Sequence, residues 1–219
     1  MSPSEKTHEY RQNAELKRLF KKMEQDGFVP FFGPKEVNGL HGTSRTQAER
    51  ILHEGFTTSP LNSNFYGQTD LLGEGLYFWE DSSGTGGLPA HSAGYRWAKH
   101  RYPKAEPAVI EAKVAFCRLL DLTHLQNVRF ALEFKDRLKT DEHIRRSIGS
   151  RKPWFLWEEA RFVKLLVLSC PKFAEIDIDG VRWNGLGLPD CYEITQTGVC
   201  VKDANCIKQI SLFDSKKNG

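Results

Sequence analysis

The chain has 219 residues, of which 39% are hydrophobic and 27% are charged, and its formal net charge is +3. These proportions are ordinary for a globular protein, and the small positive charge permits a nucleic-acid partner without requiring one. No apolar run approaches the roughly 20 residues that span a bilayer, and the polar N-terminus lacks the apolar core of a signal peptide. We therefore expect a cytoplasmic protein with no membrane partner.

The cysteines argue against disulfides and against a structural metal. Their number is odd and they include no C-x-x-C pair: Cys117, Cys170, Cys191, Cys200 and Cys206. We expect free thiols in or near the core. Zinc sites need closer Cys and His spacing than this, so we expect no metal.

The N-terminal segment predicts a helix over residues 1–26, which Gly27 ends. Four apolar residues recur at helical spacing: Leu16, Leu19, Phe20 and Met23. Such a stripe either packs on the rest of the protein or docks a partner, and packing is the commoner use. We take residues 1–36 as this helix with its connector and residues 37–219 as one domain.

The remaining chain mixes short strands with helices. In chain order, the patterns predict a strand at 37–41, a helix at 46–54 with Ser44 as a plausible cap, a loop at 57–72, a strand at 76–79, a loop at 82–89, a helix at 92–101 and a strand at 108–116. A basic helical stretch at 124–162 follows, and then strands at 164–169, 174–178, 199–202 and 209–213. Because strands and helices do not alternate strictly, the pattern indicates an α+β fold.

Four short motifs carry the chemistry: H-G-T at 41–43, I-L-x-x-G-F at 51–56, G-x-G-x-Y-F at 73–78 and S-A-x-Y at 92–95. A histidine, two tyrosines and a serine among small residues suit a nicotinamide nucleotide. Breaking its glycosidic bond builds positive charge on the ribose, as in glycoside hydrolysis. His41 would bond a ribose hydroxyl, Ser92 would bond the amide oxygen, and the rings of Tyr77 and Tyr95 would stack on the cationic pyridinium.

In this order the motifs resemble the catalytic core of ADP-ribosyltransferases of the diphtheria-toxin and poly-ADP-ribose-polymerase type. The resemblance runs from about residue 40 to 122 and resumes at about 197–213. It implies a split mixed β-sheet core, NAD+ as substrate without a metal, and mono-ADP-ribosyl transfer to a macromolecular acceptor. It places His41 and Tyr77 in the first two catalytic positions. The nucleotide-binding set that it implies is His41, Gly42, Thr43, Gly75, Tyr77, Ser92 and Tyr95.

The third catalytic position departs from the family pattern. The family usually has a glutamate that opens a late strand, and the best gap-free match places Gly198 there. Glu193, five residues earlier, is our candidate for the acid. The departure disfavours polymerisation. It also leaves two other functions open, a non-catalytic module that binds NAD+ or ADP-ribose and an NAD+ glycohydrolase.

The insertion at 124–162 has a basic segment followed by aromatic residues, which suits a phosphate backbone and stacked bases. The cations that we assign to nucleic-acid binding are Arg145, Arg146, Arg151 and Lys152, and the aromatic residues are Trp154, Phe155 and Trp157. A solvated helix face followed by core aromatics is the alternative interpretation. The acceptor is therefore RNA, DNA or a protein. A compact free-standing member of this family resembles a bacterial toxin or phage-defence effector, for which an antitoxin or chaperone partner is expected.

Overall fold

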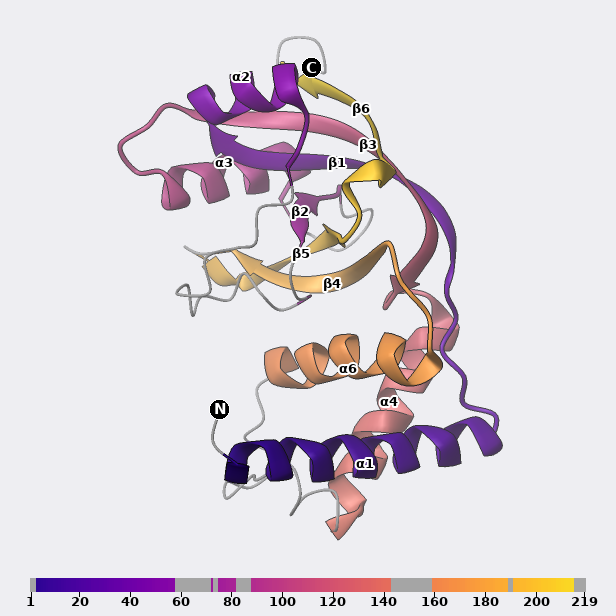
Figure 1. Ribbon diagram of the computed structural model, residues 1–219. Helices are drawn as coiled ribbons and strands as arrows, with labels where there is room; N and C mark the ends of the chain where they lie inside the picture. The colour runs from indigo at the N-terminus through magenta and orange to yellow at the C-terminus, as the bar shows by residue number, and fades with distance from the viewer. Residues whose placement is uncertain are drawn as a thin grey trace. The chain divides into compact units, whose positions relative to one another are not determined.

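The computed structural model describes residues 3–57, 72, 75–81, 88–142, 159–188 and 191–214. It divides the chain into two compact units (Figure 1). One unit contains residues 1–31 and 124–177, and the other contains residues 32–123 and 178–219. The N-terminal segment and the predicted insertion thus belong to one unit, although residues 32–123 separate them in sequence.

The first unit is helical. It contains α1 (Pro3–Gln25), α4 (Leu125–Thr140) and α6 (Glu159–Ala174). The helix predicted at the N-terminus is confirmed, and its apolar stripe is buried. The Phe20 ring of α1 lies 5.5 Å from Phe130 and 5.1 Å from both Phe134 and Phe173, measured between ring centroids. The stripe of α1 therefore serves packing within this unit.

Two strand predictions in this region are wrong. Residues 164–169 lie in the middle of α6, and residues 174–178 include the end of that helix and an irregular segment. A short apolar run has no periodicity that separates a buried strand from a buried helix. In α6 the buried apolar residues recur at helical spacing: Val163, Leu166, Val167 and Cys170. Burial of one helix face explains the run that we interpreted as a strand.

In the part of the chain that the structure describes, the second unit is built on six strands. They are β1 (Gly33–Ser44), β2 (Leu76–Trp79), β3 (Pro107–Asp121), β4 (Gly180–Leu188), β5 (Cys191–Val201) and β6 (Ile207–Leu212). The strand order is β1-β2-β5-β4-β3-β6, and β1 also pairs with β3. That extra pairing closes five strands into a ring, to which β6 adds along one edge of β3. Among the described strands only the β3–β4 pair is parallel, so the expected α+β class with a mixed sheet is confirmed, whereas an ADP-ribosyltransferase-like split of the sheet stays a prediction.

The strands at 37–41, 108–116, 199–202 and 209–213 were predicted in the right places but too short or slightly displaced, and 76–79 matches β2. The prediction omitted β4. Its sequence, G-V-R-W-N-G-L-G-L, contains three glycines, which are depleted in strands. Strand β4 is stabilised by pairing with β5 over most of its length, and no local sequence pattern predicts that pairing.

Two helices cover the β1–β3 pair on opposite faces, as Figure 1 shows: α2 (Arg45–Glu54) and α3 (Ala90–Arg101). The cap predicted for α2 is confirmed, because the Ser44 Oγ accepts a hydrogen bond of 3.3 Å from the Gln47 N–H. Ala48 and Ile51 of α2 pack with Ala108 and Ile110 of β3. Among the described residues, no helix is both long and apolar enough to cross a membrane.

Candidate functional site

His41 and Tyr77 meet where β1 and β2 run past each other. The two strands share one register pair, Leu40 with Trp79. Next to Leu40 in β1, the His41 Nδ1 lies 2.8 Å from the backbone carbonyl oxygen of Tyr77 in β2. The imidazole also packs against the rings of Phe56 and Phe78, with centroid distances of 5.2 and 5.5 Å. The first two predicted catalytic residues are therefore joined by a hydrogen bond, through the backbone of Tyr77.

This hydrogen bond fixes the chemistry of the imidazole. A carbonyl oxygen only accepts, so Nδ1 must carry the hydrogen that it donates to Tyr77. Burial lowers the pKa of His41, and the bond to the Tyr77 carbonyl offsets part of that effect, so that the pKa stays below its ordinary value. The imidazole is neutral at pH 7, and Nε2 is then an acceptor. Such a nitrogen suits a ribose hydroxyl, which donates.

The Tyr77 side chain is half-buried and its hydroxyl already has one partner. The hydroxyl oxygen accepts a hydrogen bond of 3.1 Å from the Leu72 N–H, and Leu72 is fully buried. The Leu72 carbonyl in turn accepts from the Lys202 Nζ at 2.6 Å. Tyr77 therefore anchors the end of the segment that leads into β2, in addition to any contact with a nucleotide.

Two of the predicted glycines have packing reasons of their own. A Cβ on Gly42 would lie 1.8 Å from the carbonyl oxygen of Gly94, so β1 touches the backbone of α3 there. Gly75 has a φ of 152°, and a Cβ on it would lie 2.5 Å from the Val201 carbonyl oxygen. Both positions exclude a side chain for structural reasons. Their contact with a nucleotide stays a prediction, as does that of Thr43, which is 2% exposed.

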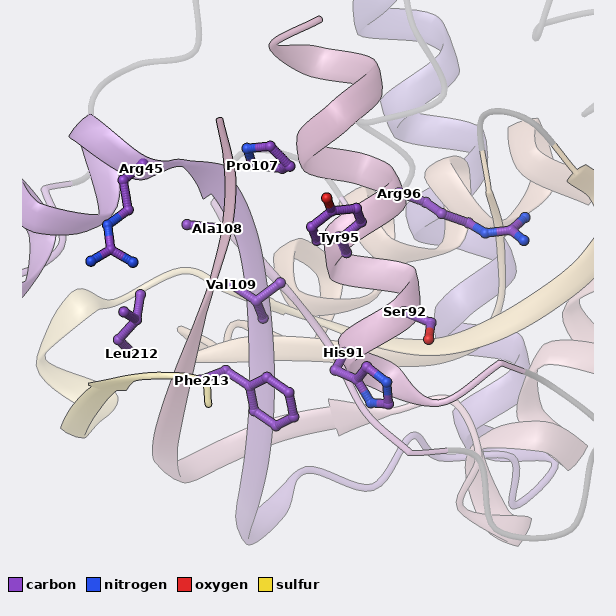
Figure 2. A pocket seen from close by; sticks show the side chains of 10 residues that line it. All are labelled: Arg45, His91, Ser92, Tyr95, Arg96, Pro107, Ala108, Val109, Leu212 and Phe213. Atoms are coloured by element: carbon purple, nitrogen blue, oxygen red, sulfur yellow. The ribbon is translucent and has the colours of Figure 1, made fainter. Parts of the chain in front are cut away.

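Ser92 and Tyr95 lie on α3 and line a pocket of about 460 Å³ with residues of β3 and β6 (Figure 2). The helix lacks a cap of its own at Pro89. Instead the Asp81 Oδ1, just after β2, accepts from the Ala90 N–H at 2.7 Å. Tyr95 is 49% exposed. The pocket lining does not include His41 or Tyr77, so the four predicted residues form two pairs, which the Gly42–Gly94 contact connects.

The late strand carries no acid at the expected position. Gly198 is buried in β5 and pairs with Trp79 on β2 and with Trp183 on β4. Glu193 lies in the same strand, about 16 Å away along an extended backbone. The backbone thus places Glu193 well along the strand from the Tyr77 end, and its catalytic role stays a prediction.

Glu80 is the described carboxylate that follows Tyr77 most closely along the chain, and it is already paired. Both of its carboxylate oxygens lie 3.0 Å from the Arg182 Nε. Arg182 also contacts Asp121 at 3.3 Å, and Asp121 contacts the Lys35 Nζ at 2.6 Å. Burial raises the pKa of Asp121, but the hydrogen bonds from Lys35 and Thr123 and the Arg182 charge outweigh it and lower that pKa. This network, which ties β1, β2, β3 and β4 together, holds the end of β2 and leaves Glu80 no role as an unpaired base.

Sequence reasoning missed this network and most of the pocket. Arg45, His91, Arg96 and Phe213 line the pocket from two helices, α2 and α3, and from the chain just after β6. No local pattern joins them; the only signal is that Arg45 follows the H-G-T motif closely and Arg96 follows Tyr95. The predicted nucleic-acid residues Arg145, Arg146, Arg151 and Lys152 lie outside the described residues.

No protein-family model matches the chain, and no curated protein matches it. Among solved structures, a chain of the crystal structure of the M. tuberculosis MbcT–MbcA toxin–antitoxin complex is similar at a TM-score of 0.35 and 11% identity. The match covers 83% of this chain and 86% of that chain. At this TM-score it supports neither a fold nor a function for this chain.

Proposed function

We propose that this chain is a mono-ADP-ribosyltransferase that transfers ADP-ribose from NAD+ to a macromolecular acceptor. The observation that carries the proposal is the bond between the His41 Nδ1 and the Tyr77 carbonyl. It sets a neutral imidazole, with Nε2 as acceptor, beside the strand of the second catalytic position. The four motifs in order supply the other parts of a nicotinamide-nucleotide site.

In the proposed chemistry the main role of the protein is to bind and polarise the substrate. Nicotinamide leaves as a neutral molecule, and positive charge develops on the ribose. The His41 Nε2 would orient a ribose hydroxyl, and the rings of Tyr77 and Tyr95 would contact the pyridinium. A general base is the missing part, for which Glu193 remains our candidate.

A non-catalytic module that binds NAD+ or ADP-ribose is the second candidate function. The observation that favours it is Gly198, which brings no carboxylate to the late strand. The ion pair of Glu80 with Arg182 removes the obvious substitute. This candidate and the transferase differ in whether NAD+ is consumed. The NAD+ glycohydrolase is a third outcome of the same measurement, with water as the acceptor.

The test is incubation of the protein with labelled NAD+ and cell lysate. Label on RNA, DNA or protein supports the transferase, free ADP-ribose alone indicates the glycohydrolase, and no turnover with NAD+ bound indicates the module. His41→Ala and Tyr77→Ala should each lower turnover at least about 100-fold, the scale of one lost transition-state contact. His53→Ala, an exposed histidine of α2, is the matched control. Near wild-type turnover in either folded site variant would refute the assignment.

We further propose that the activity is toxic to cells and is restrained by an antitoxin or chaperone. Consumption of NAD+ or modification of an essential macromolecule would each stop growth. Induced expression in bacteria should therefore arrest growth, and His41→Ala should relieve the arrest at equal protein level. Growth arrest by the folded His41→Ala protein would show that toxicity does not depend on this site.

A further inference from the structure

The pocket beside α3 has a positive rim. Among the residues that the structure describes, its lining includes two arginines and no acidic side chain. The Arg45 Nε pairs with Glu49 at 3.0 Å, at an exposed position, and no hydrogen bond to another described residue involves its terminal nitrogens. Arg96 is exposed, and no ion pair with another described residue involves it. In Figure 2, Arg45 and Arg96 lie on opposite sides of the pocket's aromatic rings.

Between the arginines the lining is aromatic and apolar. The rings of His91 and Phe213 stack at a centroid distance of 5.3 Å and an interplanar angle of 10°. The half-exposed ring of Tyr95 and the side chain of Val109 belong to the same lining (Figure 2). A volume of about 460 Å³ falls in the range of small-ligand sites, roughly 300–1,000 Å³. Flat rings with cations on both sides suit a planar aromatic group that is flanked by anions.

We propose that the His91–Phe213 side of this pocket binds an unstacked base of a single-stranded nucleic acid, with Arg45 and Arg96 on the phosphates at either side of it, while Ser92 and Tyr95 keep the nicotinamide contacts of the proposed function. Guanidinium groups match phosphate geometry, and bases stack on aromatic side chains in single-strand sites. Two cations on opposite sides fit a strand that passes over the pocket better than a lone mononucleotide, whose charge lies at one end. A duplex would hide the base in its own stack.

The position of the pocket suits an acceptor, and this part rests on the proposed function. Val109 of the lining is the register partner of Gly42, the residue after His41. In the transfer, an O–H or N–H of the nucleic acid would attack the anomeric carbon of the ribose. The bond from that carbon to the nicotinamide nitrogen breaks, nicotinamide leaves with the electron pair, and the acceptor proton passes through the general base, for which Glu193 is the candidate, to water. The pocket would thus select nucleic acid over protein as the acceptor.

The test measures binding of a short 5′-labelled single-stranded RNA by fluorescence anisotropy, without NAD+. Arg45→Gln and Arg96→Gln should each weaken binding about tenfold, and each should reduce the slope of log K against log salt by about 0.7, the value for one lost phosphate contact on a single strand. Phe213→Leu should weaken binding with an unchanged slope, because it removes stacking and no charge. Arg50→Gln, on the same helix as Arg45 but outside the pocket lining, is the matched control and should bind like wild type.

Three outcomes would overturn the proposal. The first is wild-type RNA affinity in both arginine variants, Arg45→Gln and Arg96→Gln. The second is displacement of the RNA by NAD+ together with an equal loss of NAD+ affinity in the variants, which would assign the pocket to NAD+. The third is label transfer to protein at the wild-type rate in Arg45→Gln and Arg96→Gln. RNA binding that depends on both arginines in a protein that never consumes NAD+ would support the site and contradict the proposed transferase.

Discussion

At the scale of single residues, the chemistry of His41 depends on one backbone carbonyl. The Tyr77 oxygen accepts from Nδ1 at 2.8 Å and so leaves Nε2 without a hydrogen in the neutral ring. Burial adds to this by disfavouring the charged form. The sequence placed the histidine beside Gly42, but the tautomer comes from a residue 36 positions later.

The lowered pKa of His41 predicts a pH dependence of stability. The unfolded chain binds a proton near the ordinary histidine pKa of about 6.5, whereas the folded protein binds it only at lower pH. Stability should therefore be full above about pH 6.5 and should fall as the pH drops from there to the folded pKa. His41→Gln, which retains a donor for the Tyr77 carbonyl but does not titrate, should flatten this dependence in urea unfolding measured from pH 7.5 to 5.

The control for this measurement is His53→Gln at an exposed position of α2, which should leave the pH dependence as in wild type. Curves for His41→Gln and wild type that run parallel over the whole range would show that His41 titrates alike in both states.

At the scale of elements, the contact of β1 with α3 positions half of the candidate site. Gly42 of the strand approaches Gly94 of the helix so closely that neither a methyl group nor a water fits at the Gly42 Cβ position. The helix carries Ser92 and Tyr95, and the strand carries His41. The spacing of these two elements therefore sets the spacing of the two predicted residue pairs.

Gly42→Ala should destabilise the protein by about 3 kcal/mol, at the upper end of overpacking costs. The added methyl would lie 1.8 Å from a backbone carbonyl oxygen, which no side-chain rotation relieves. Gly94→Ala is the matched variant, because its Cβ would be in ordinary contact with the Val109 methyl groups at 3.4 and 3.5 Å and with the Gly42 N at 3.6 Å. We expect it to be neutral, or to stabilise α3 by up to about 1 kcal/mol. Denaturant unfolding of both variants tests the asymmetry, and equal losses would contradict it.

At the scale of the whole molecule, the chain builds two cores from interleaved segments. Residues 1–31 join residues 124–177 in one unit, and the segments between and after them form the other. The helical unit centres on the phenylalanine cluster around Phe20. The strand-bearing unit centres on Phe78 and its neighbours on β3 and β5. Each unit therefore has apolar burial of its own to stabilise it.

Phe134→Ala should test whether the two units unfold independently of each other. Phe134 is fully buried, and its truncation should cost about 3–5 kcal/mol. Hydrogen exchange should then speed up in α1, α4 and α6 and stay near wild type in β1, β3 and β5. Leu132→Ala on the same helix, where the side chain is 62% exposed, is the control and should change little. Equal acceleration in both units would show that they unfold as one.

The sequence alone determined what depends on neighbours along the chain. The helix at 46–54 and its Ser44 cap follow from a hydroxyl three residues before an N–H. Local sequence also predicts the apolar stripe of α1, the strand β2 and the order of the four motifs. The same local logic failed at 164–169, because apolar content without a period fits a helix as well as a strand.

Only the tertiary structure decided what depends on distant segments meeting. The closure of β1 on β3, the tautomer of His41, and the ion pairs that occupy Glu80 each join residues far apart in sequence. So does the pocket, whose two arginines come from α2 and α3 and whose Phe213 follows β6. Hydrogen bonds and charge pairs across a fold depend on spatial distance and burial. The spacing of residues in the sequence determines neither the spatial distance nor the burial. The motifs therefore identified the candidate residues, and the packing of strands and helices determined what each side chain contacts.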